Sequence, residues 1–386
     1  MRIGILTLPF HINYGGILQG YALQTILERL GHEVVIYQRV AKHQFSLPLW
    51  KLPLVYAKRI CLRLFVNKNQ VIFVEQRKVK ELPVIRQHTN NFIKDHIHTI
   101  PFDSPECINI SEVDCIIVGS DQIWRPLYVR KVLKSEIENA FLKFTEGWKG
   151  KRIAYAASFG VDEWEYSPEQ TKECRRLVKY FDAVSVREDF AVQLCVDYLN
   201  VKAIHVLDPT LLLSKEDYIK LIMEANVPKS DGTLFSYILD EAPEKQSFVD
   251  NVARNFNMKP FNIGLASSKL NAPLERRVAQ PVEKWLRGFY DAKFIVTDSF
   301  HGCVFSIIFE KPFVVIDNEE RGMLRIKSLL SMFNMEGRLI KDFYQLPQLS
   351  ILVQSNYSME LDSLREKSLD FLKDALTMQS ESTKVL

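Results

Sequence analysis

The feature of the sequence that most constrains the fold is a repeated order of short apolar run, polar loop and helical pattern. In the stretch FIVTDSFHGCVFSIIFEKPFVVI, the apolar residues 294–296 precede a Thr-Asp-Ser loop, a helical pattern at 304–309 and a second apolar run at 312–316. This order predicts a strand, a helix and a parallel strand, which form a right-handed crossover. The loop of such a unit lies at the carboxyl edge of the sheet, where open α/β sheets bind ligands.

The start of the chain shows the same order, with predicted strands at residues 3–6 and 34–37 and a predicted helix at 17–30. Further predicted strands end in polar loops, at residues 115–118, 183–186, 234–238 and 260–263. This alternation predicts an α/β fold with two doubly wound, Rossmann-like domains that face each other across a cleft.

The length of 386 residues exceeds what one ordinary hydrophobic core holds, so two domains are expected. We predict an N-terminal α/β domain at residues 1–210, with a basic helical insertion at residues 41–100. A C-terminal α/β domain is predicted at residues 211–350. Residues 351–386 are predicted to contain a helix that packs back on the N-terminal domain.

The composition is typical of a folded soluble protein, with 47% hydrophobic and 25% charged residues. No signal peptide precedes the first predicted strand, and no apolar run reaches the roughly 18 residues that span a bilayer. We therefore expect a cytoplasmic protein. The six cysteines are scattered, and the sequence has no P-loop, dinucleotide fingerprint or metal-binding pattern. No metal and no cofactor are expected.

The net charge of +3 conceals a basic segment at residues 41–100, which holds eleven Lys and Arg against three Asp and Glu, a balance of +8. Its stretch FSLPLWKLPLVYAKRICLRLFV mixes Trp, Phe and Leu with Lys51, Lys58, Arg59 and Arg63. This mixture is typical of peripheral contact with an anionic membrane, here the inner face. The alternative is a helical subdomain with a solvated basic face. No recognition motif accompanies the charge, so nucleic-acid binding is not expected.

Polar residues at the ends of predicted strands form a candidate site. His301 follows the strong N-cap residues Asp298 and Ser299, which places it in the first turn of a helix. Asp298 and Ser299 are also expected to bind the substrate. A histidine with its ordinary pKa of about 6.5 gives and takes protons near neutral pH. Arg187 follows the strand at 183–186, and its planar guanidinium suits a carboxylate or phosphate. A salt bridge to an adjacent acidic residue is the alternative for this arginine.

The loop after the first strand, in NYGGILQGYALQ, contributes Asn13, Gly15 and Gly16 at the amino end of a helix. The partial positive charge of a helix amino end favours anions, and glycine allows a ligand to approach closely. Arg321 and Arg325 follow a predicted strand that ends at the same edge. Together these groups predict an anionic ligand beside a proton donor.

The stretch GSDQIW places Ser120, Asp121 and Trp124 at the end of another predicted strand. A carboxylate beside an aromatic ring is typical of sugar binding, since the carboxylate accepts hydroxyl protons and the ring covers an apolar sugar face. The alternative is a helix cap and a core tryptophan.

Taken in order, these motifs resemble the polysaccharide pyruvyl transferase family. The motifs are NYGGILQGYALQ, VGSDQIW, SVREDFAVQLC, LDPTLLL and VTDSFHGCVFSIIFEKPFVVI, and the similarity extends from residue 3 to near residue 333. The resemblance implies a two-domain fold similar to that of the B-type glycosyltransferases. It also implies transfer of pyruvate from phosphoenolpyruvate to a saccharide as a ketal, in cell-surface polysaccharide biosynthesis. The acceptor is either lipid-linked or nucleotide-linked.

By this resemblance, Arg187 matches the strand-end arginine proposed to hold the donor in the family, and His301 matches its histidine. Some members have Arg-Leu-His where this chain has Ser299-Phe300-His301, so the second donor arginine is absent at that position. Arg321 is the residue that we expect to replace it. Two other functions stay open. One is a nucleotide-sugar-dependent glycosyltransferase. The other is a non-catalytic saccharide-binding protein, which is favoured by the presence of Ser299 where some members have an arginine.

Overall fold

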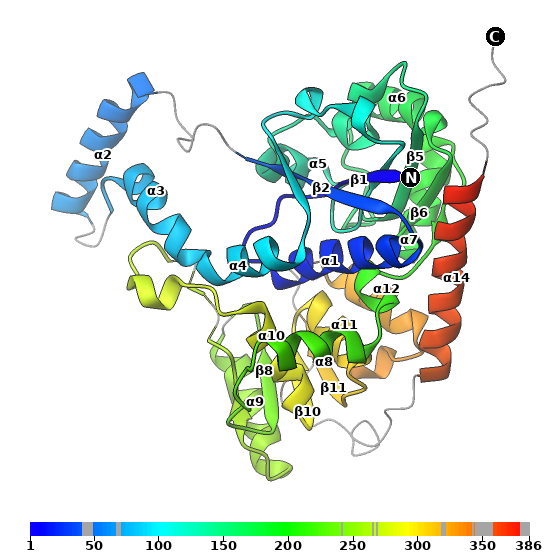
Figure 1. Ribbon diagram of the computed structural model, residues 1–386. Coiled ribbons are helices and arrows are strands. Elements are labelled where there is room, and N and C mark those ends of the chain that lie inside the picture. The colour runs from blue at the N-terminus through cyan, green and yellow to red at the C-terminus, as the bar shows by residue number, and fades with distance from the viewer. Residues whose placement is uncertain are drawn as a thin grey trace.

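Two parallel β-sheets with helices packed around them form the body of the protein in the computed structural model (Figure 1). The structure describes residues 1–40, 49–66, 71–240, 242–264, 266–267, 269–317, 322–341, 343 and 358–378. Every strand pair within this part of the chain is parallel. The predicted α/β class with two doubly wound sheets is therefore confirmed.

The N-terminal sheet has its strands in the order β3-β2-β1-β4-β5-β6-β7. Their bounds are β1 (Arg2–Leu6), β2 (Glu33–Arg39), β3 (Thr99–Phe102), β4 (Cys115–Val118), β5 (Lys151–Ala157), β6 (Ala183–Val186) and β7 (Ile204–His205). All four residues of β4 are buried, as expected for a parallel sheet with both faces covered. The strand order reverses between β1 and β4, and ligands of open α/β sheets bind at such switch points.

The C-terminal sheet has the order β12-β11-β10-β8-β9. Its strands are β8 (Leu234–Tyr237), β9 (Pro260–Phe261), β10 (Phe294–Thr297), β11 (Phe313–Ile316) and β12 (Leu339–Ile340). Here the order reverses between β8 and β10. The second sheet therefore has its own switch point, and the loop that leads to His301 starts there.

Helices connect the strands of both sheets, as a parallel sheet requires. They are α1 (Tyr14–Arg29), α2 (Leu52–Phe65), α3 (Val74–Ile85), α4 (Gln87–His96), α5 (Pro126–Tyr128), α6 (Pro168–Leu177), α7 (Asp189–Leu194), α8 (Lys215–Glu224), α9 (Pro243–Asn255), α10 (Val282–Asp291), α11 (Phe300–Ile308), α12 (Met323–Met332) and α14 (Ser358–Thr377). α1 begins three residues before the predicted start, so Gly15 and Gly16 lie inside its first turn.

One cluster of buried apolar side chains runs through both domains, from the strands of the first sheet to α10 and α11. Tyr14 of α1 stacks on Trp285 of α10 with ring centroids 5.5 Å apart. The Tyr14 hydroxyl also donates to the carbonyl of Gln280 at 3.1 Å. These contacts join the amino end of α1 directly to the C-terminal domain.

The C-terminal helix α14 runs along one side of the body (Figure 1). The Ser368 hydroxyl accepts a hydrogen bond from the backbone N–H of Leu207 at 3.0 Å. Arg365 donates to the carbonyl of Leu211 at 2.9 Å. The helix thus contacts the segment that connects the two domains.

The basic insertion between β2 and β3 forms α2, α3 and α4, and its last residues add the edge strand β3, which the sequence did not predict. α4 packs near α1 and α10, whereas α2 stands apart from both domains (Figure 1). Among the described residues, no helix is both long enough and apolar enough to cross a membrane.

Candidate active site

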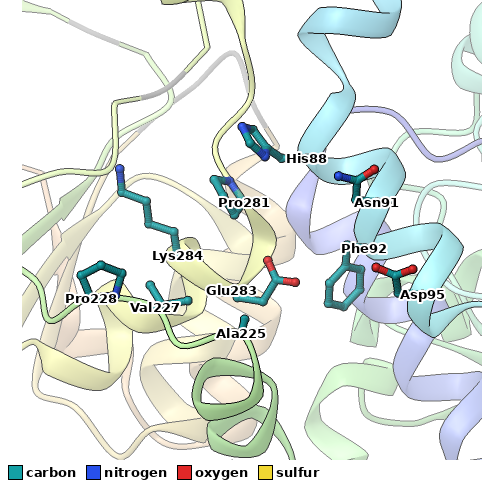
Figure 2. Close-up of a pocket in the computed structure, with 10 residues that line it drawn as sticks. All are labelled: His88, Asn91, Phe92, Asp95, Ala225, Val227, Pro228, Pro281, Glu283 and Lys284. Carbon is teal, nitrogen blue, oxygen red and sulfur yellow. The ribbon is translucent and has the colours of Figure 1, made fainter.

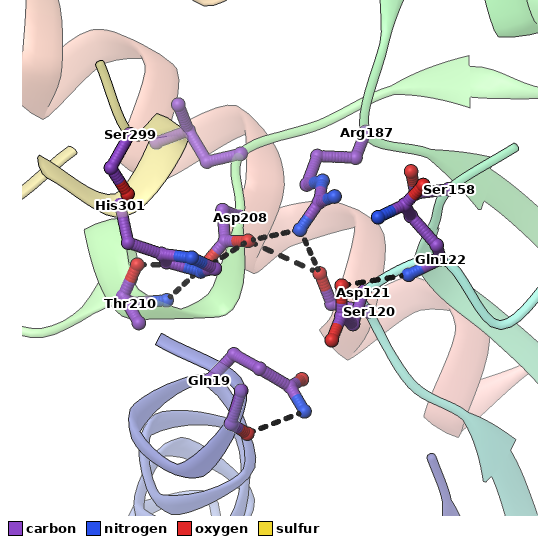
Figure 3. A network of polar contacts seen from close by, with 12 residues as sticks. Gln19, Ser120, Asp121, Gln122, Ser158, Arg187, Asp208, Thr210, Ser299 and His301 are labelled. Atoms are coloured by element: carbon purple, nitrogen blue, oxygen red, sulfur yellow. Dashed lines mark hydrogen bonds and ion pairs between the residues drawn. The ribbon is translucent and has the colours of Figure 1, made fainter. Parts of the chain in front are cut away.

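The candidate site lies where side chains from the carboxyl ends of both sheets meet (Figure 3). The loops after β4 and β6 bring Ser120 and Arg187, and the loop after β10 brings His301. Asp208, in the segment that connects the domains, lies between them. All four residues are more than nine-tenths buried. Polar residues from the ends of several strands therefore lie together, and both domains contribute to this site.

His301 is held at the amino end of α11 and lies directly over α1. Ser299 is the N-cap of α11, and its hydroxyl accepts a hydrogen bond from the N–H of Gly302 at 3.4 Å. His301 thus lies in the first turn, as predicted. A Cβ atom on Gly15 would lie 2.0 Å from Nδ1 of His301. The ring occupies space that only a glycine leaves open.

The other ring nitrogen of His301 points toward Asp208, with Nε2 3.8 Å from Oδ2. This distance is too long for a hydrogen bond. Nε2 is buried and has no hydrogen-bond partner among the described residues. The position therefore leaves a nitrogen free to exchange a proton with a bound substrate.

Arg187 is paired on two sides within the site. Its Nη1 donates to Oδ2 of Asp208 at 2.9 Å, and its Nε donates to Oε1 of Glu188 at 3.2 Å. The salt bridge to the adjacent Glu188, which the sequence left as an alternative, is formed. Burial lowers the pKa of Arg187, but Glu188 and Asp208 outweigh it and raise the pKa above its ordinary value. Nη2 has no hydrogen-bond partner among the described residues.

Asp208 is the anionic centre of the network. Its Oδ1 accepts from the Thr210 N–H at 3.0 Å and the Thr210 hydroxyl at 2.7 Å. Its Oδ2 also accepts from the Ser120 hydroxyl at 3.2 Å. Burial alone would raise the pKa of this carboxyl, but His301, Arg187 and the Thr210 hydrogen bonds hold it below its ordinary value. Asp208 is therefore ionised at neutral pH.

The surroundings of His301 set its resting charge. Burial is the largest effect and lowers the pKa of His301 to about 4, although Asp208 acts in the opposite direction. Arg187 and Arg325 lower it further. The imidazole is therefore neutral at neutral pH, and in this state it accepts a proton before it donates one.

Asp121, Asn13 and Gly16 surround the amino end of α1. A Cβ atom on Gly16 would lie 3.1 Å from Nδ2 of Asn13 and 3.6 Å from Oδ2 of Asp121. Asp121 has a left-handed backbone with φ 64° and accepts a hydrogen bond from the N–H of Gln122 at 2.9 Å. The sequence placed these three residues at one edge, and the structure brings them together there.

Two predicted binding residues lie in structural positions instead. Trp124 is fully buried, stacks on Phe141 with centroids 4.6 Å apart, and donates from Nε1 to the carbonyl of Ala140 at 3.2 Å. Its ring cannot cover a sugar, so the interpretation as a core tryptophan is correct. Asp298 is also buried, pairs with Lys245 at 3.0 Å, and accepts from the N–H of Leu239 at 2.7 Å. It anchors the loop after β8.

Two pockets lie outside this network. One, of about 320 Å³, opens between α4 and α10 and exposes polar groups of Asn91, Asp95 and Glu283 (Figure 2). The other, of about 500 Å³, is formed by residues that follow β4 and β5, among them Glu136 and Trp164. No group of three or more His, Cys, Asp or Glu that could hold a metal ion occurs in the described part of the chain.

Comparison with protein families gives one match that covers most of the chain. The family model described as polysaccharide pyruvyl transferase matches residues 13–320. This chain belongs to the polysaccharide pyruvyl transferase family. A comparison with curated proteins gave no match.

Several solved structures resemble the whole chain at low sequence identity. The Arabidopsis thaliana protein UGT89C1 with UDP-L-rhamnose has a TM-score of 0.48 at 10% identity, over 97% of this chain and 99% of that one. UDP-GlcNAc 2-epimerase from Neisseria meningitidis, bound to UDP-GlcNAc, has a TM-score of 0.47 at 12% identity, over 98% and 95%. MnaA of S. aureus with UDP has a TM-score of 0.48 at 12% identity, over 99% and 98%.

Phe300, which follows Ser299 in the chain, lies close to two arginines. Phe300 has the guanidinium carbon of Arg187 at 4.5 Å from its ring centroid and that of Arg325 at 5.9 Å. Arg321, the predicted replacement for the second donor arginine, lies outside the described residues. Arg325, four residues further along the chain, lies beside Phe300 at the edge of the network.

The most important residue that the sequence did not single out for a role is Asp208. In the sequence it stands out only as part of the motif LDPTLLL. A signal was present, because Asp-Pro-Thr after a strand predicts the local turn in which Asp208 accepts hydrogen bonds from Thr210. Phe300 carries no such signal, since its role depends on contacts with Arg187 and Arg325, which lie elsewhere in the sequence.

Proposed function

We propose that this protein transfers pyruvate from phosphoenolpyruvate to a saccharide as a ketal, in the synthesis of a cell-surface polysaccharide such as an exopolysaccharide. One observation carries the proposal. His301, with an unpaired Nε2, lies in the same buried network as Arg187, with an unpaired Nη2. A proton-transfer group beside an anion-binding group is the combination that this reaction requires.

The reaction forms two carbon–oxygen bonds at one carbon, the first by addition and the second by substitution. A sugar hydroxyl oxygen bonds to the enol carbon of the donor, and the methylene carbon gains a proton. A second hydroxyl oxygen then replaces the phosphate at the same carbon and closes the ketal ring. One hydroxyl proton ends on the new methyl group, and the other leaves with the phosphate. The neutral His301 takes the first hydroxyl proton and, once protonated, can deliver it to the methylene carbon.

The donor carries both a carboxylate and a phosphate, so it needs several positive groups close together. We assign Nη2 of Arg187, the guanidinium of Arg325 and the amino end of α1 at Gly15 and Gly16 to this role. Arg325 is then the replacement for the second donor arginine. A bound anion beside His301 also favours its protonated form, so donor binding raises the pKa of this histidine toward neutrality.

We assign the acceptor to the side of Asp121, which is half-buried at the same edge. An ionised carboxylate accepts hydrogen bonds only, which suits the hydroxyl groups of a saccharide. Ser120 is a less direct candidate, because its hydroxyl already donates to Asp208.

The test is to incubate the purified protein with phosphoenolpyruvate and a panel of lipid-linked and nucleotide-linked sugars. We expect release of phosphate together with an acceptor heavier by one pyruvate less one water. Consumption of a nucleotide sugar, with no reaction of phosphoenolpyruvate, would identify a glycosyltransferase instead. Binding of a saccharide without turnover of either donor would identify a non-catalytic protein.

A further inference from the structure

The outward face of α2 is apolar, which is unusual for a helix exposed to water. Residues 54, 57, 61 and 64 recur at helical spacing and are all exposed. The largest apolar side chains around this face are strongly exposed: Trp50 at 71%, Leu54 at 72%, Leu64 at 68% and Phe65 at 83%. We call Trp50, which lies just before α2, together with Leu54, Leu64 and Phe65 the apolar stripe.

The opposite face of α2 is the one that packs on the protein. Tyr56 makes an edge-to-face contact with Phe73, with ring centroids 5.0 Å apart. Arg59 forms a two-pronged salt bridge with Glu75, with N–O distances of 2.8 and 2.9 Å. The inner face is therefore already satisfied by the chain, and the apolar stripe points away from it.

The helix is held at a defined place on the body. Glu81 of α3 forms an ion pair with Arg277 of the C-terminal domain. The N–H of Ala279 also donates to the carbonyl of Ile85 at 2.9 Å. α3 thus connects α2 to the rest of the protein, and α2 is the outermost element on that side (Figure 1).

The charge around the apolar stripe has one sign. Residues 49–66 contain four basic residues and no acidic one. Lys51, Lys58 and Arg63 are exposed, and Lys51 lies 4.9 Å from the ring centroid of Trp50. Arg59 belongs to the inner face through its pair with Glu75, so it does not contribute to the charge around the stripe.

We infer that the apolar stripe of α2 docks on the surface of an anionic lipid membrane. Large apolar and aromatic side chains bounded by lysine and arginine are suited to the boundary between acyl chains and anionic headgroups. A solvated helix face would be polar, which the stripe is not. A second copy fits less well, because symmetric packing would bring the same basic residues together. The inference is independent of the proposed reaction.

The test uses the full chain and vesicles of phosphatidylglycerol mixed with phosphatidylcholine. The protein should sediment with these vesicles at low salt, and not with phosphatidylcholine alone. It should be released at about 1 M salt, because the Debye length is then about 3 Å and the attraction between basic residues and anionic headgroups is screened. The emission of Trp50 should shift to shorter wavelength on binding, and the shift should be absent in Trp50→Phe.

Two paired variants separate the apolar and charged parts of this surface. Lys51→Glu with Lys58→Glu should weaken vesicle partition by more than about tenfold, whereas Lys202→Glu with Lys229→Glu, at exposed positions elsewhere, should not. Leu54→Ser with Leu64→Ser should also weaken it. The matched control is Val196→Ser with Met223→Ser, at positions 46% and 47% exposed.

Circular dichroism checks that each variant is folded. Failure of the folded wild-type protein to bind phosphatidylglycerol vesicles at low salt would overturn the inference. Equal loss in the control variants would overturn it as well. A dimer that forms without vesicles and disappears in Leu54→Ser with Leu64→Ser, without any lipid binding, would identify a second copy as the occupant.

Discussion

His301 connects three parts of the molecule through one imidazole ring. The residue belongs to α11, its ring covers Gly15 of α1, and its Nε2 faces Asp208 in the segment between the domains. Burial keeps the ring neutral and leaves Nε2 without a partner among the described residues. A buried polar atom without a partner costs free energy, so its persistence at a ligand-binding edge is expected of a functional group.

The first prediction concerns His301 itself. His301→Ala should lower turnover by about 10² to 10⁴ because the proton-transfer group is removed. His301→Gln, which preserves more of the volume, should be similarly inactive. Phosphate release from phosphoenolpyruvate in the presence of the acceptor measures this. Near-wild-type turnover in both folded variants would refute the role.

The second prediction concerns the contact between His301 and Gly15. Gly15→Ala places a methyl group where Nδ1 of the ring lies, so the ring must leave the position in which its Nε2 faces Asp208. We expect a loss of turnover close to that of His301→Ala and a stability cost of about 1–3 kcal/mol. Urea unfolding and phosphate release measure the two effects.

Gly337→Ala is the matched control for this substitution, because a Cβ there meets no atom within 4 Å. It should leave turnover unchanged. If Gly15→Ala were as active as Gly337→Ala, the close approach of the ring would have no role in the reaction.

The third prediction concerns Arg187. Lysine offers one charged nitrogen in place of the planar fork, and it cannot hold Asp208, Glu188 and a donor anion together. Arg187→Lys should weaken binding of phosphoenolpyruvate by about 10- to 100-fold. Calorimetric titration measures this, with the exposed Arg254→Lys as control. Unchanged affinity would show that Arg187 only maintains the network.

At the scale of elements, the site depends on where strands end and helices begin. Each contributing loop leaves the carboxyl end of a parallel strand, so its polar residues reach one edge. The Ser299 cap sets the first turn of α11, and that turn sets the direction of His301. The position of α2 depends less on the sheets. Its ion pair, Arg59 with Glu75, and its ring contact, Tyr56 with Phe73, are both made with other residues of the insertion.

The fourth prediction concerns the contact between α2 and α3. Arg59→Ala leaves the Glu75 side chain, which is 5% exposed, without its bidentate partner. We expect a coupling energy of about 1–3 kcal/mol between the two positions. Hydrogen exchange of the α2 amides in Arg59→Ala, Glu75→Gln and the double variant measures it. The exposed Arg63→Ala should not change this exchange, and additive effects of the first two variants would contradict the coupling.

At the scale of the whole molecule, the two domains share one hydrophobic core and a site to which both contribute. The stability of the protein and the protonation of the site are therefore linked. A histidine that is neutral when buried and free to protonate when unfolded couples the two directly.

The fifth prediction is the resulting dependence of stability on pH. The folded pKa of His301 is about 4, below its unfolded value of 6.5. Between these values the unfolded chain binds a proton that the folded protein does not, so stability falls as pH falls through this window. The contribution of His301 between pH 7 and pH 5 is about 2 kcal/mol.

Urea unfolding of the ligand-free protein at both pH values measures this loss. Burial also lowers the pKa of His11 to about 4, so His11 contributes in the same direction. His301→Gln removes only the His301 part and should be less sensitive to pH than the wild-type protein. An identical loss in the variant would contradict the assigned neutral state of His301.

Local patterns in the sequence determined the fold class and part of the site. Apolar runs of strand length, helical spacing and N-cap residues act over a few neighbours, so they predicted parallel sheets and the first-turn position of His301. They also placed Arg187 and the Gly15-Gly16 pair at strand ends. The family resemblance, rather than these patterns, supplied the expected reaction.

Tertiary structure alone decided which of these residues meet. Asp208 meets Arg187 and Ser120 because the segments after β4, β6 and β7 reach one edge of the N-terminal sheet. It faces His301 only because the two domains pack against each other, and no local pattern encodes that packing. Trp124 became a core residue because Phe141 covers it. The neutral state of His301 is decided in the same way, since burial and the nearby charges exist only in the folded molecule.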